Sequence, residues 1–411
     1  MSAPRCLMLA PFPLAAPRHG GQVRAATLVQ ALRMAGWHVD TAGLFHADLF
    51  PSAEWGALDI VVASPDVARR ATDDMVFGDL HVARAAAADP ATVDAMRRLV
   101  ARLRPDVIHV EHPWAWLVLE HALPAHDRPK VVYSSQNIEW SARPALFEIG
   151  LKRPGGDELV EATRLLETEF ARRADLVLSI SDLEAKQIAA DAGREVAYVP
   201  PVSDLAHGQP HLHGAYAHAA REAGGVRYAA LMGSAYWPNV EGFFATFPHG
   251  LGFLAQDEQI WVAGGLGPAL REDPRHQDYL SVNDARLRAW GYLADADKPS
   301  FFASAACVIV PVTIGAGAKL KTADALASGL PVIITPHALE GYGPLVGDAL
   351  DAGVYVADTP RRFRELVRQA LRSGLQGCPL AVRERVSHGR LARELAQLYA
   401  PLARQAAPAG G

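Results

Sequence analysis

The sequence has few cysteines and no excess of positive charge. It contains only 3 cysteines in 411 residues, and Cys6, Cys307 and Cys378 form no C-x-x-C pair. This excludes a disulfide framework and a zinc ribbon, and it is typical of a reducing compartment. Lys and Arg number 40 against 45 Asp and Glu, giving a net charge of −5, which argues against a protein that binds nucleic acid with its whole surface.

Long apolar runs are also missing. The apolar stretch 305–312 is far shorter than the ~18 residues of a membrane-spanning helix, and Pro11 and Pro13 interrupt the N-terminal run before a signal-peptide pattern develops. We therefore expect a cytoplasmic protein. The basic helix with Arg97, Arg98 and Arg102 leaves two interpretations open, a solvated face or peripheral contact with the inner face of the membrane.

The residues that are present predict two α/β domains. Half of them (50%) are hydrophobic and 21% are charged, which is a globular composition, and the length suits two cores. Short apolar runs alternate with helical patterns, as in parallel sheets covered on both faces. The expected strands are 6–10, 39–44, 60–63, 107–110, 131–135, 176–180, 196–199, 228–232, 259–263, 288–292, 307–310 and 331–335. The clearest expected helices are 23–34, 92–103, 361–371 and 391–402.

A change in composition marks the domain boundary. Pro200 and Pro201 open a stretch rich in His, Ala, Gly and Pro that continues to Gly225. We predict a first domain at 1–200, a linker at 201–226, a second domain at 227–385, and a C-terminal helix within 386–411.

The most informative segment is 311–335. It reads as a strand, a loop with Gly315 and Gly317, a helix from about Lys319, a stop and a second strand. Free backbone N–H groups and lysines at a helix N-terminus form an anion site, here suited to a diphosphate. Asp324, one turn after Lys321, is placed to accept hydrogen bonds from ribose or sugar hydroxyls. The alternative is an ordinary helix cap with a surface pair between Lys321 and Asp324.

This segment resembles the donor motif of family 4 glycosyltransferases, with the pattern G-x-G-x-r-x-K-x-x-E followed by G-x-P-V. Four further segments are similar to family motifs in the same order. They are Pro11–Gly21 (the first acceptor-side loop), Gln136–Glu139 (the H-N-x-E turn), Met232–Asn239 (the opening of the second domain) and Ala338–Gly341 (the x-x-E-G after the donor helix). The resemblance extends from about residue 5 to about residue 345.

The resemblance implies the GT-B fold, an α/β architecture of two facing Rossmann-like domains with parallel sheets and a cleft between them. The first domain would bind the acceptor, the second the nucleotide sugar, and the last helix would cross back to the first domain. The implied reaction is retaining transfer of a sugar from a nucleotide-diphosphate donor to a hydroxyl of a glycan, lipid-linked glycan or other glycoconjugate, in bacterial surface polysaccharide synthesis. Neither a cofactor nor a metal is expected.

The candidate site residues follow from these matches. The donor site comprises Lys319, Lys321 and Asp324 as catalytic residues, with Gly233, Gly315, Ala316, Gly317 and Glu340 as further contacts. The acceptor or donor-phosphate loop comprises Gly20, Gly21, His112, Gln136 and Asn137.

Two positions depart from the family pattern. Asp324 stands where the family has Glu, so its carboxylate reaches one methylene less far. Gln136 replaces a His, which keeps hydrogen bonding but excludes general acid or base catalysis at that position.

Weaker signals favour structural interpretations. Asp295 and Asp297 match the D-x-D of metal-dependent glycosyltransferases, but a helix-capping loop explains them better. The histidines 207, 211, 213 and 218 read as a solvated loop rather than metal ligands. Three alternatives remain for the whole chain: a GT-B pseudoenzyme that binds a partner, a nucleotide-sugar epimerase, and a metal-using transferase built on Asp295 and Asp297.

Overall fold

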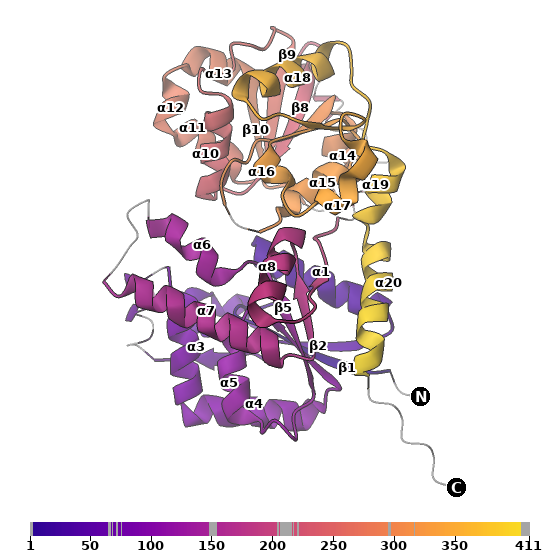
Figure 1. Cartoon of the computed structure of the whole chain (residues 1–411). Helices are drawn as coiled ribbons and strands as arrows, with labels where there is room; N and C mark the ends of the chain where they lie inside the picture. The colour runs from indigo at the N-terminus through magenta and orange to yellow at the C-terminus, as the bar shows by residue number, and fades with distance from the viewer. Residues whose placement is uncertain are drawn as a thin grey trace. The chain divides into compact units, whose positions relative to one another are not determined.

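The chain forms two α/β units in a computed structural model (Figure 1). The structure describes residues 3–64, 67, 69–70, 73–74, 76–147, 154–203, 205, 216, 218–219, 222–294, 297–315 and 317–403. Unit 1 comprises Met1–Val199 and Leu391–Gly411, and unit 2 comprises Pro200–Arg390. The predicted α/β fold with parallel sheets is confirmed.

Unit 1 is built on a 7-stranded parallel sheet in the order β3-β2-β1-β4-β5-β6-β7. Its strands are short and mostly buried, because helices cover both faces. The strands are β1 (Arg5–Ala10), β2 (His38–His46), β3 (Ile60–Val62), β4 (Val107–Glu111), β5 (Lys130–Ser135), β6 (Leu176–Ser179) and β7 (Ala197–Tyr198).

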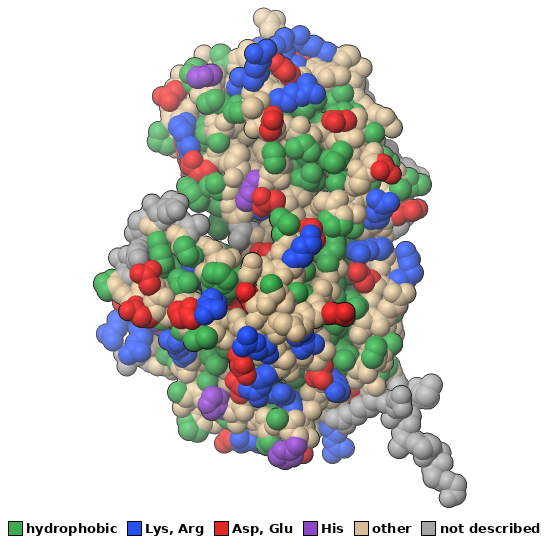
Figure 2. Space-filling view, in the orientation of Figure 1, with side chains coloured by type: hydrophobic (Ala, Val, Ile, Leu, Met, Phe, Trp, Pro, Cys, Tyr) green, Lys and Arg blue, Asp and Glu red, His purple; other side chains and the backbone are tan. Residues whose placement is uncertain are grey.

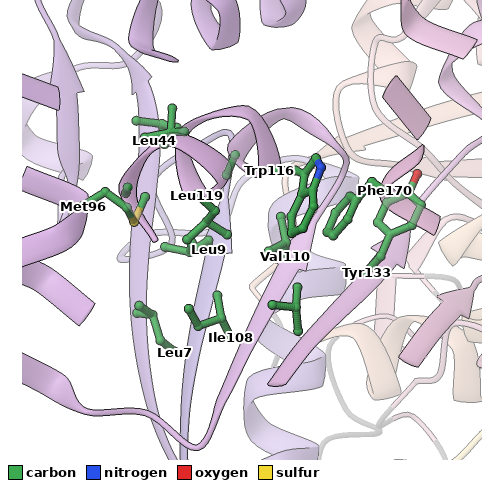
Figure 3. Close-up of a cluster of buried hydrophobic side chains, with 14 of the residues drawn as sticks. Leu7, Leu9, Leu44, Met96, Ile108, Val110, Trp116, Leu119, Tyr133 and Phe170 are labelled. Carbon is green, nitrogen blue, oxygen red and sulfur yellow. The ribbon is translucent and has the colours of Figure 1, made fainter. Parts of the chain in front are cut away.

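The helices of unit 1 pack on this sheet through apolar side chains. On one face, Trp116 stacks on Phe170 with ring centroids 4.4 Å apart, and Leu9 and Val110 lie below them (Figure 3). Each such fully buried side chain stabilises the fold by roughly 1.5–3 kcal/mol. The helices are α1 (Gly20–Met34), α3 (Gly78–Ala88), α4 (Pro90–Leu103), α5 (Trp114–Ala122), α6 (Glu139–Leu146), α7 (Gly156–Arg173), α8 (Asp182–Ala192) and α20 (His388–Tyr399), with 3-10 turns η1 (Ala47–Leu49), η2 (Ser52–Glu54) and η8 (Ala400–Leu402).

Unit 2 repeats the same plan with a 6-stranded parallel sheet in the order β10-β9-β8-β11-β12-β13. The strands are β8 (Arg227–Met232), β9 (Glu258–Ala263), β10 (Leu287–Gly291), β11 (Cys307–Val310), β12 (Val332–Ile334) and β13 (Val354–Val356). The helices are α10 (Trp237–Thr246), α11 (Leu266–Glu272), α12 (Pro274–Gln277), α13 (Leu280–Arg286), α14 (Lys298–Ala303), α15 (Leu320–Ala327), α16 (Pro336–Leu339), α17 (Gly343–Val346), α18 (Pro360–Arg372) and α19 (Leu380–Arg385), with the 3-10 turn η7 (Gly347–Ala349).

The segment predicted as a linker contributes to the core of unit 2. Most of 201–226 lies outside the described residues, but Tyr216 packs edge-on against Trp290 and Phe301, with ring centroids 5.0 and 5.4 Å apart. At the other end of the chain, Leu391, Leu395 and Tyr399 of α20 are fully buried. Residues from Leu391 onward belong to unit 1.

The described surface shows no large region of one charge on the face in Figure 2, where acidic and basic side chains are interspersed over each unit. Among the described residues, no helix has both the length and the apolar character that crossing a bilayer requires.

Candidate functional site

Both sheets reverse their strand order at one point. In unit 1 the reversal lies between β1 and β4, and in unit 2 it lies between β8 and β11. The connections that follow these strands leave to opposite sides, so a crevice opens at the carboxyl ends of the two strands, where α/β proteins bind ligands. The candidate motifs occupy these points: Pro11–Gly21 follows β1, and the segment with Gly315 and Gly317 follows β11.

The glycine loop of unit 2 has the backbone of an anion site. Gly315 and Gly317 have φ angles of 108° and 69°, a region that L side chains rarely adopt. Helix α15 begins directly after Lys319, which occupies the N-cap position without a side-chain capping hydrogen bond. The Thr322 N–H donates to the Lys319 carbonyl at 2.9 Å, so the N–H groups of Leu320 and Lys321, which precede it in the first turn, are the ones placed to bind an anion. Ala316, the other predicted contact of this loop, lies outside the described residues.

The two predicted lysines lie close together at this helix start. The Lys321 ammonium donates a hydrogen bond to Asn239 Oδ1, and Asn239 Nδ2 donates to the Ser234 carbonyl at 2.9 Å. Lys319 Nζ donates to the Gly315 carbonyl at 3.1 Å. Burial, together with the nearby charge of Lys319, lowers the pKa of Lys321 to about 7. A bound anion favours the charged form of both lysines, so the arrangement suits a diphosphate.

Asp324 has a protein partner in this structure. Its Oδ1 accepts a hydrogen bond from Ser203 Oγ at 2.6 Å, and the Ser203 N–H donates to the Val386 carbonyl at 2.9 Å. Lys321 and Asp324 thus have different hydrogen-bond partners, Asn239 for Lys321 and Ser203 for Asp324. Asp324 connects the start of unit 2 to α15.

The other predicted donor contacts surround the glycine loop. Glu340 pairs with His337 Nδ1 at 3.1 Å, and His337 Nε2 contacts the Gly315 carbonyl at 2.7 Å. Gly233 follows β8. A Cβ atom added to Gly264 would lie 2.3 Å from the carbonyl oxygen of Gly233. Close backbone contact between the loops after β8 and β9 therefore requires glycine at residue 264.

The candidate residues of unit 1 meet at the carboxyl end of its sheet. Gly20 and Gly21 form the start of α1, which His19 caps by accepting a hydrogen bond from the Gln22 N–H at 3.4 Å. Gln136 Nε2 donates to the Gly21 carbonyl at 3.2 Å. The carbonyl of Asn137 accepts from Ser135 Oγ at 2.7 Å.

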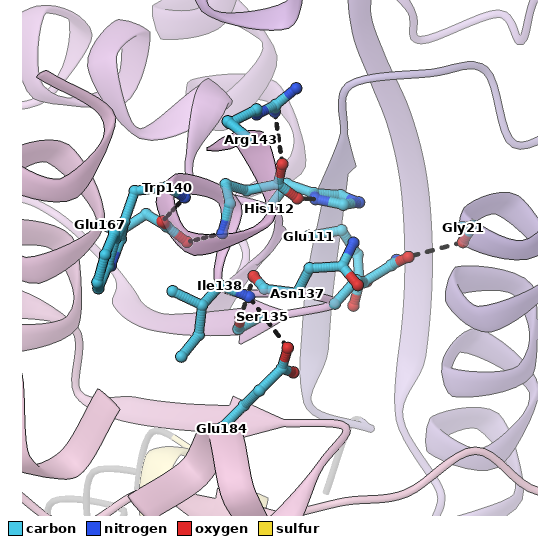
Figure 4. A network of polar contacts seen from close by, with 12 residues as sticks. Gly21, Glu111, His112, Ser135, Asn137, Ile138, Trp140, Arg143, Glu167 and Glu184 are labelled. Carbon is cyan, nitrogen blue, oxygen red and sulfur yellow. Dashed lines mark hydrogen bonds and ion pairs between the residues drawn. The ribbon is translucent and has the colours of Figure 1, made fainter. Parts of the chain in front are cut away.

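His112 is held by a carboxylate in a strained backbone position. Its φ angle is 61°, which is unusual for a residue other than glycine and is common at functional sites. Its Nδ1 lies 2.9 Å from Glu139 Oε1, and Glu139 Oε2 accepts from Arg143 at 2.5 Å. Figure 4 shows His112, Arg143 and Glu167 around the start of α6.

The protonation states follow from these contacts. Burial alone would lower the pKa of His112, but the hydrogen bond and charge of Glu139 raise it above its ordinary value. Burial would raise the pKa of Glu139, yet His112 and Arg143 lower it to about 2. Glu139 is ionised near neutral pH and accepts the hydrogen bond from His112 Nδ1, and the raised pKa of His112 favours the imidazolium, whose Nε2 can donate to a ligand oxygen.

Glu167 is a second buried carboxyl group behind this pair. Its two oxygens accept from the N–H groups of Glu139 and Trp140 at 3.1 and 3.0 Å, which holds the start of α6. Burial and the charge of Glu139 raise the pKa of Glu167 to about 8. Sequence reasoning missed Glu139, Arg143 and Glu167 as site residues, although Glu139 closes the H-N-x-E turn.

A mostly apolar pocket lies at the same edge of the sheet. Its volume is about 10 Å³, which is room for about one water molecule. The lining residues are Pro11, Leu44, Phe45, Leu49, Asp79, Val82, Ala83 and Trp114. Trp114 follows His112 by two residues, so this apolar pocket lies close to His112 and its partner Glu139.

Most residues of the weaker sequence signals lie outside the part of the chain that the structure describes. Asp295 lies outside them, and Asp297 stands at the N-cap of α14 without a capping hydrogen bond. His218 lies 3.5 Å from Glu222 on an exposed surface, and histidines 207, 211 and 213 lie outside the described residues. Within the described part of the chain, no group of three or more His, Cys, Asp or Glu side chains is arranged to hold a metal ion.

Comparison with known families matches both units. The model of the glycosyl transferase 4-like domain matches residues 19–202, and the model of the glycosyl transferases group 1 matches residues 229–373. No curated protein sequence matches the chain significantly.

Solved structures share the fold over nearly the whole chain. Sucrose-phosphate synthase from Thermosynechococcus elongatus is 16% identical with a TM-score of 0.68, covering 97% of this chain and 99% of its own. HepE from Anabaena in complex with UDP is 13% identical with a TM-score of 0.67, covering 97% and 100%. The catalytic domain of starch synthase IV from Arabidopsis thaliana, bound to ADP and acarbose, is 13% identical with a TM-score of 0.61, covering 98% and 99%.

Proposed function

Because the chain belongs to the glycosyltransferases that combine a 4-like domain with a group 1 domain, we propose that it transfers a sugar from a nucleotide-diphosphate donor to a hydroxyl acceptor with retained anomeric configuration. The observation that carries this proposal is the helix start after Gly315 and Gly317, with Lys319 and Lys321 beside it. Similar structures hold UDP or ADP, which supports a nucleotide donor.

Unit 2 supplies the charge that the reaction requires. The bond between the anomeric carbon and the diphosphate oxygen breaks, the acceptor oxygen bonds to the same face of that carbon, and the acceptor proton passes to the leaving phosphate oxygen. Negative charge grows on the diphosphate in this step, and preorganised N–H groups and ammonium groups stabilise it. Two lysines and a helix N-terminus can supply this stabilisation, so we propose that transfer needs no divalent cation.

Unit 1 is the proposed acceptor domain. His112, oriented by Glu139, contacts a sugar or phosphate oxygen of the acceptor through Nε2. We propose a glycan or glycoconjugate acceptor and a role in bacterial surface polysaccharide synthesis. The free, buried thiols of Cys6, Cys307 and Cys378 support a cytoplasmic location.

The experiment that tests this function is a transfer assay in chelator. Wild-type protein is incubated with UDP-, GDP-, dTDP- and ADP-sugars and a panel of methyl glycosides, and both the released nucleotide and the glycoside product are measured. We expect one nucleotide to be released in step with product of retained configuration. An isomerised sugar nucleotide formed without acceptor, or activity that appears only with added metal, would contradict the proposal.

A further inference from the structure

A chain of buried polar side chains crosses unit 1 on the sheet face opposite the apolar cluster of Figure 3. Its members are His109 and Glu111 on β4, Tyr399 on α20 and Gln136 after β5. Because successive strand residues point to opposite faces, His109 and Glu111 share one face while Ile108 and Val110 line the other. His109, Glu111 and Tyr399 are 0% exposed, so each polar atom depends on its protein partner.

The contacts form one continuous path. The Tyr399 hydroxyl contacts His109 Nδ1, and His109 Nε2 lies 2.6 Å from Glu111 Oε1. Glu111 Oε2 accepts from Gln136 Nε2, which also donates to the Gly21 carbonyl at 3.2 Å. Burial would raise the pKa of Glu111, but His109, Arg24 and Gln136 lower it to about 2. Ionised Glu111 can only accept, so His109 donates to it from Nε2.

This path fixes the orientation of the Gln136 amide. Both partners of Nε2, the Glu111 carboxylate and the Gly21 carbonyl, are oxygens that only accept, so the NH₂ group must face them. The opposite end, Oε1, lies against Gly21, where an added Cβ atom would be 3.1 Å from it. The group that Gln136 presents at the start of α1 is therefore a hydrogen-bond acceptor.

We propose that Gln136 Oε1 accepts a hydrogen bond from a hydroxyl or N–H group of the sugar acceptor, and that Tyr399 positions Gln136 through His109 and Glu111. This inference rests on the proposed transfer to a hydroxyl. A ligand with an ether, carboxylate or phosphate oxygen at this position faces a second acceptor and binds weakly, because neither oxygen supplies a proton. Through Tyr399, the C-terminal helix thereby contributes to acceptor selection.

The positioning role is tested without activity. In protein labelled with ¹⁵N-glutamine, the side-chain NH₂ signals of Gln136 are assigned with Gln136→Met. We expect Tyr399→Phe to shift these signals. Tyr228→Phe, which removes another buried hydroxyl that donates to the Phe301 carbonyl at 2.6 Å, leaves them in place. Unchanged Gln136 signals in a folded Tyr399→Phe protein would show that Tyr399 does not position Gln136.

The ligand role is tested with the methyl glycoside that serves as acceptor. Gln136→Met should raise the acceptor KM about tenfold, as expected for one lost hydrogen bond, and should remove the preference for the free hydroxyl over singly O-methylated glycosides. The KM of the donor should stay the same. An unchanged acceptor KM with transfer intact would refute the ligand role alone. Absence of transfer by wild type with every glycoside would refute the proposed function and this role together, while the NMR comparison still decides the role of Tyr399.

Discussion

The protonation of Lys321 can be tested through the pH dependence of ligand binding. Its pKa of about 7 in the free protein rises when a diphosphate binds, since the anion favours the charged form. When binding raises the pKa of a group, that group strengthens binding fully at pH values below its pKa in the free protein. Its contribution to the binding free energy decreases as the pH rises above that pKa. We therefore predict that the Kd of the bound sugar nucleotide increases between pH 7 and pH 9, with proton uptake visible by calorimetry in buffers of different ionisation enthalpy.

Lys321→Met serves as the control for this pH dependence. The variant should bind more weakly at pH 7 and show a nearly constant Kd across the same range. A pH-dependent Kd that persists in the variant would assign the effect to another group.

Glu167 gives a second prediction at the residue scale. Its pKa is raised to about 8 in the folded protein, so between its unfolded value near 4.5 and pH 8 the folded state retains a proton that the unfolded state loses. The contribution of this group to stability therefore falls as pH rises through that window. Glu167→Gln, which imitates the protonated form, should reduce the loss of Tm between pH 5 and pH 8. A parallel Tm curve for wild type and variant would show that Glu167 is ionised in the fold.

The sequence identified residues that match short motifs and missed those that only the fold brings together. Gly315, Gly317 and Lys321 could be proposed as site residues from the sequence because they lie close together around one helix start. Glu167 and Tyr399 reach their sites through tertiary packing, from residues far along the chain from Gln136 and Glu139. No local pattern predicts such pairs.

Among the elements, α10 sets the position of the glycine loop. A Cβ atom added to Gly242 would lie 2.1 Å from the Pro311 carbonyl, so this helix packs directly on the segment that leads to Gly315. Gly242→Ala should displace that segment, lower the free energy of unfolding by about 1–3 kcal/mol, and weaken sugar-nucleotide binding. Chemical unfolding and calorimetric titration measure the two effects.

Gly252→Ala provides the matched comparison. Its Cβ atom would meet only Val282 at an ordinary 3.8 Å, so stability and binding should change little. If the two substitutions had equal effects, close packing of Gly242 against the Pro311 carbonyl would not explain the loss of stability and binding.

A strand could be predicted where its apolar run is long enough to indicate a strand without other information. The expected strand 307–310 coincides with β11, and 259–263 differs from β9 by one residue. Strand β13 was missed because Val354–Val356 is only 3 residues long. Helix α1 begins at Gly20, earlier than the expected residue 23, because His19 caps it, and His is not among the usual capping residues.

At the scale of the whole molecule, the last helix belongs to the core of unit 1. Leu395 is 0% exposed on α20, whereas Leu165 on α7 is 57% exposed. Leu395→Ala should lower the free energy of unfolding of unit 1 by about 2–5 kcal/mol, and Leu165→Ala should change it by less than about 0.5 kcal/mol. Hydrogen exchange read by peptide should locate the loss of protection in unit 1. A loss confined to unit 2 would contradict the assignment of α20.

The central claim is that the helix start after Gly315 and Gly317 binds a nucleotide diphosphate. The most direct measurement is calorimetric titration of UDP, GDP, dTDP and ADP in chelator into wild type, Lys321→Ala and Lys186→Ala, a substitution at an exposed lysine of α8. We predict binding of one nucleotide, weakened at least tenfold by Lys321→Ala, as for a lost hydrogen bond to a charged group, and unchanged by Lys186→Ala. Binding that survives Lys321→Ala at full strength, or no binding of any nucleotide by wild type, would contradict the account.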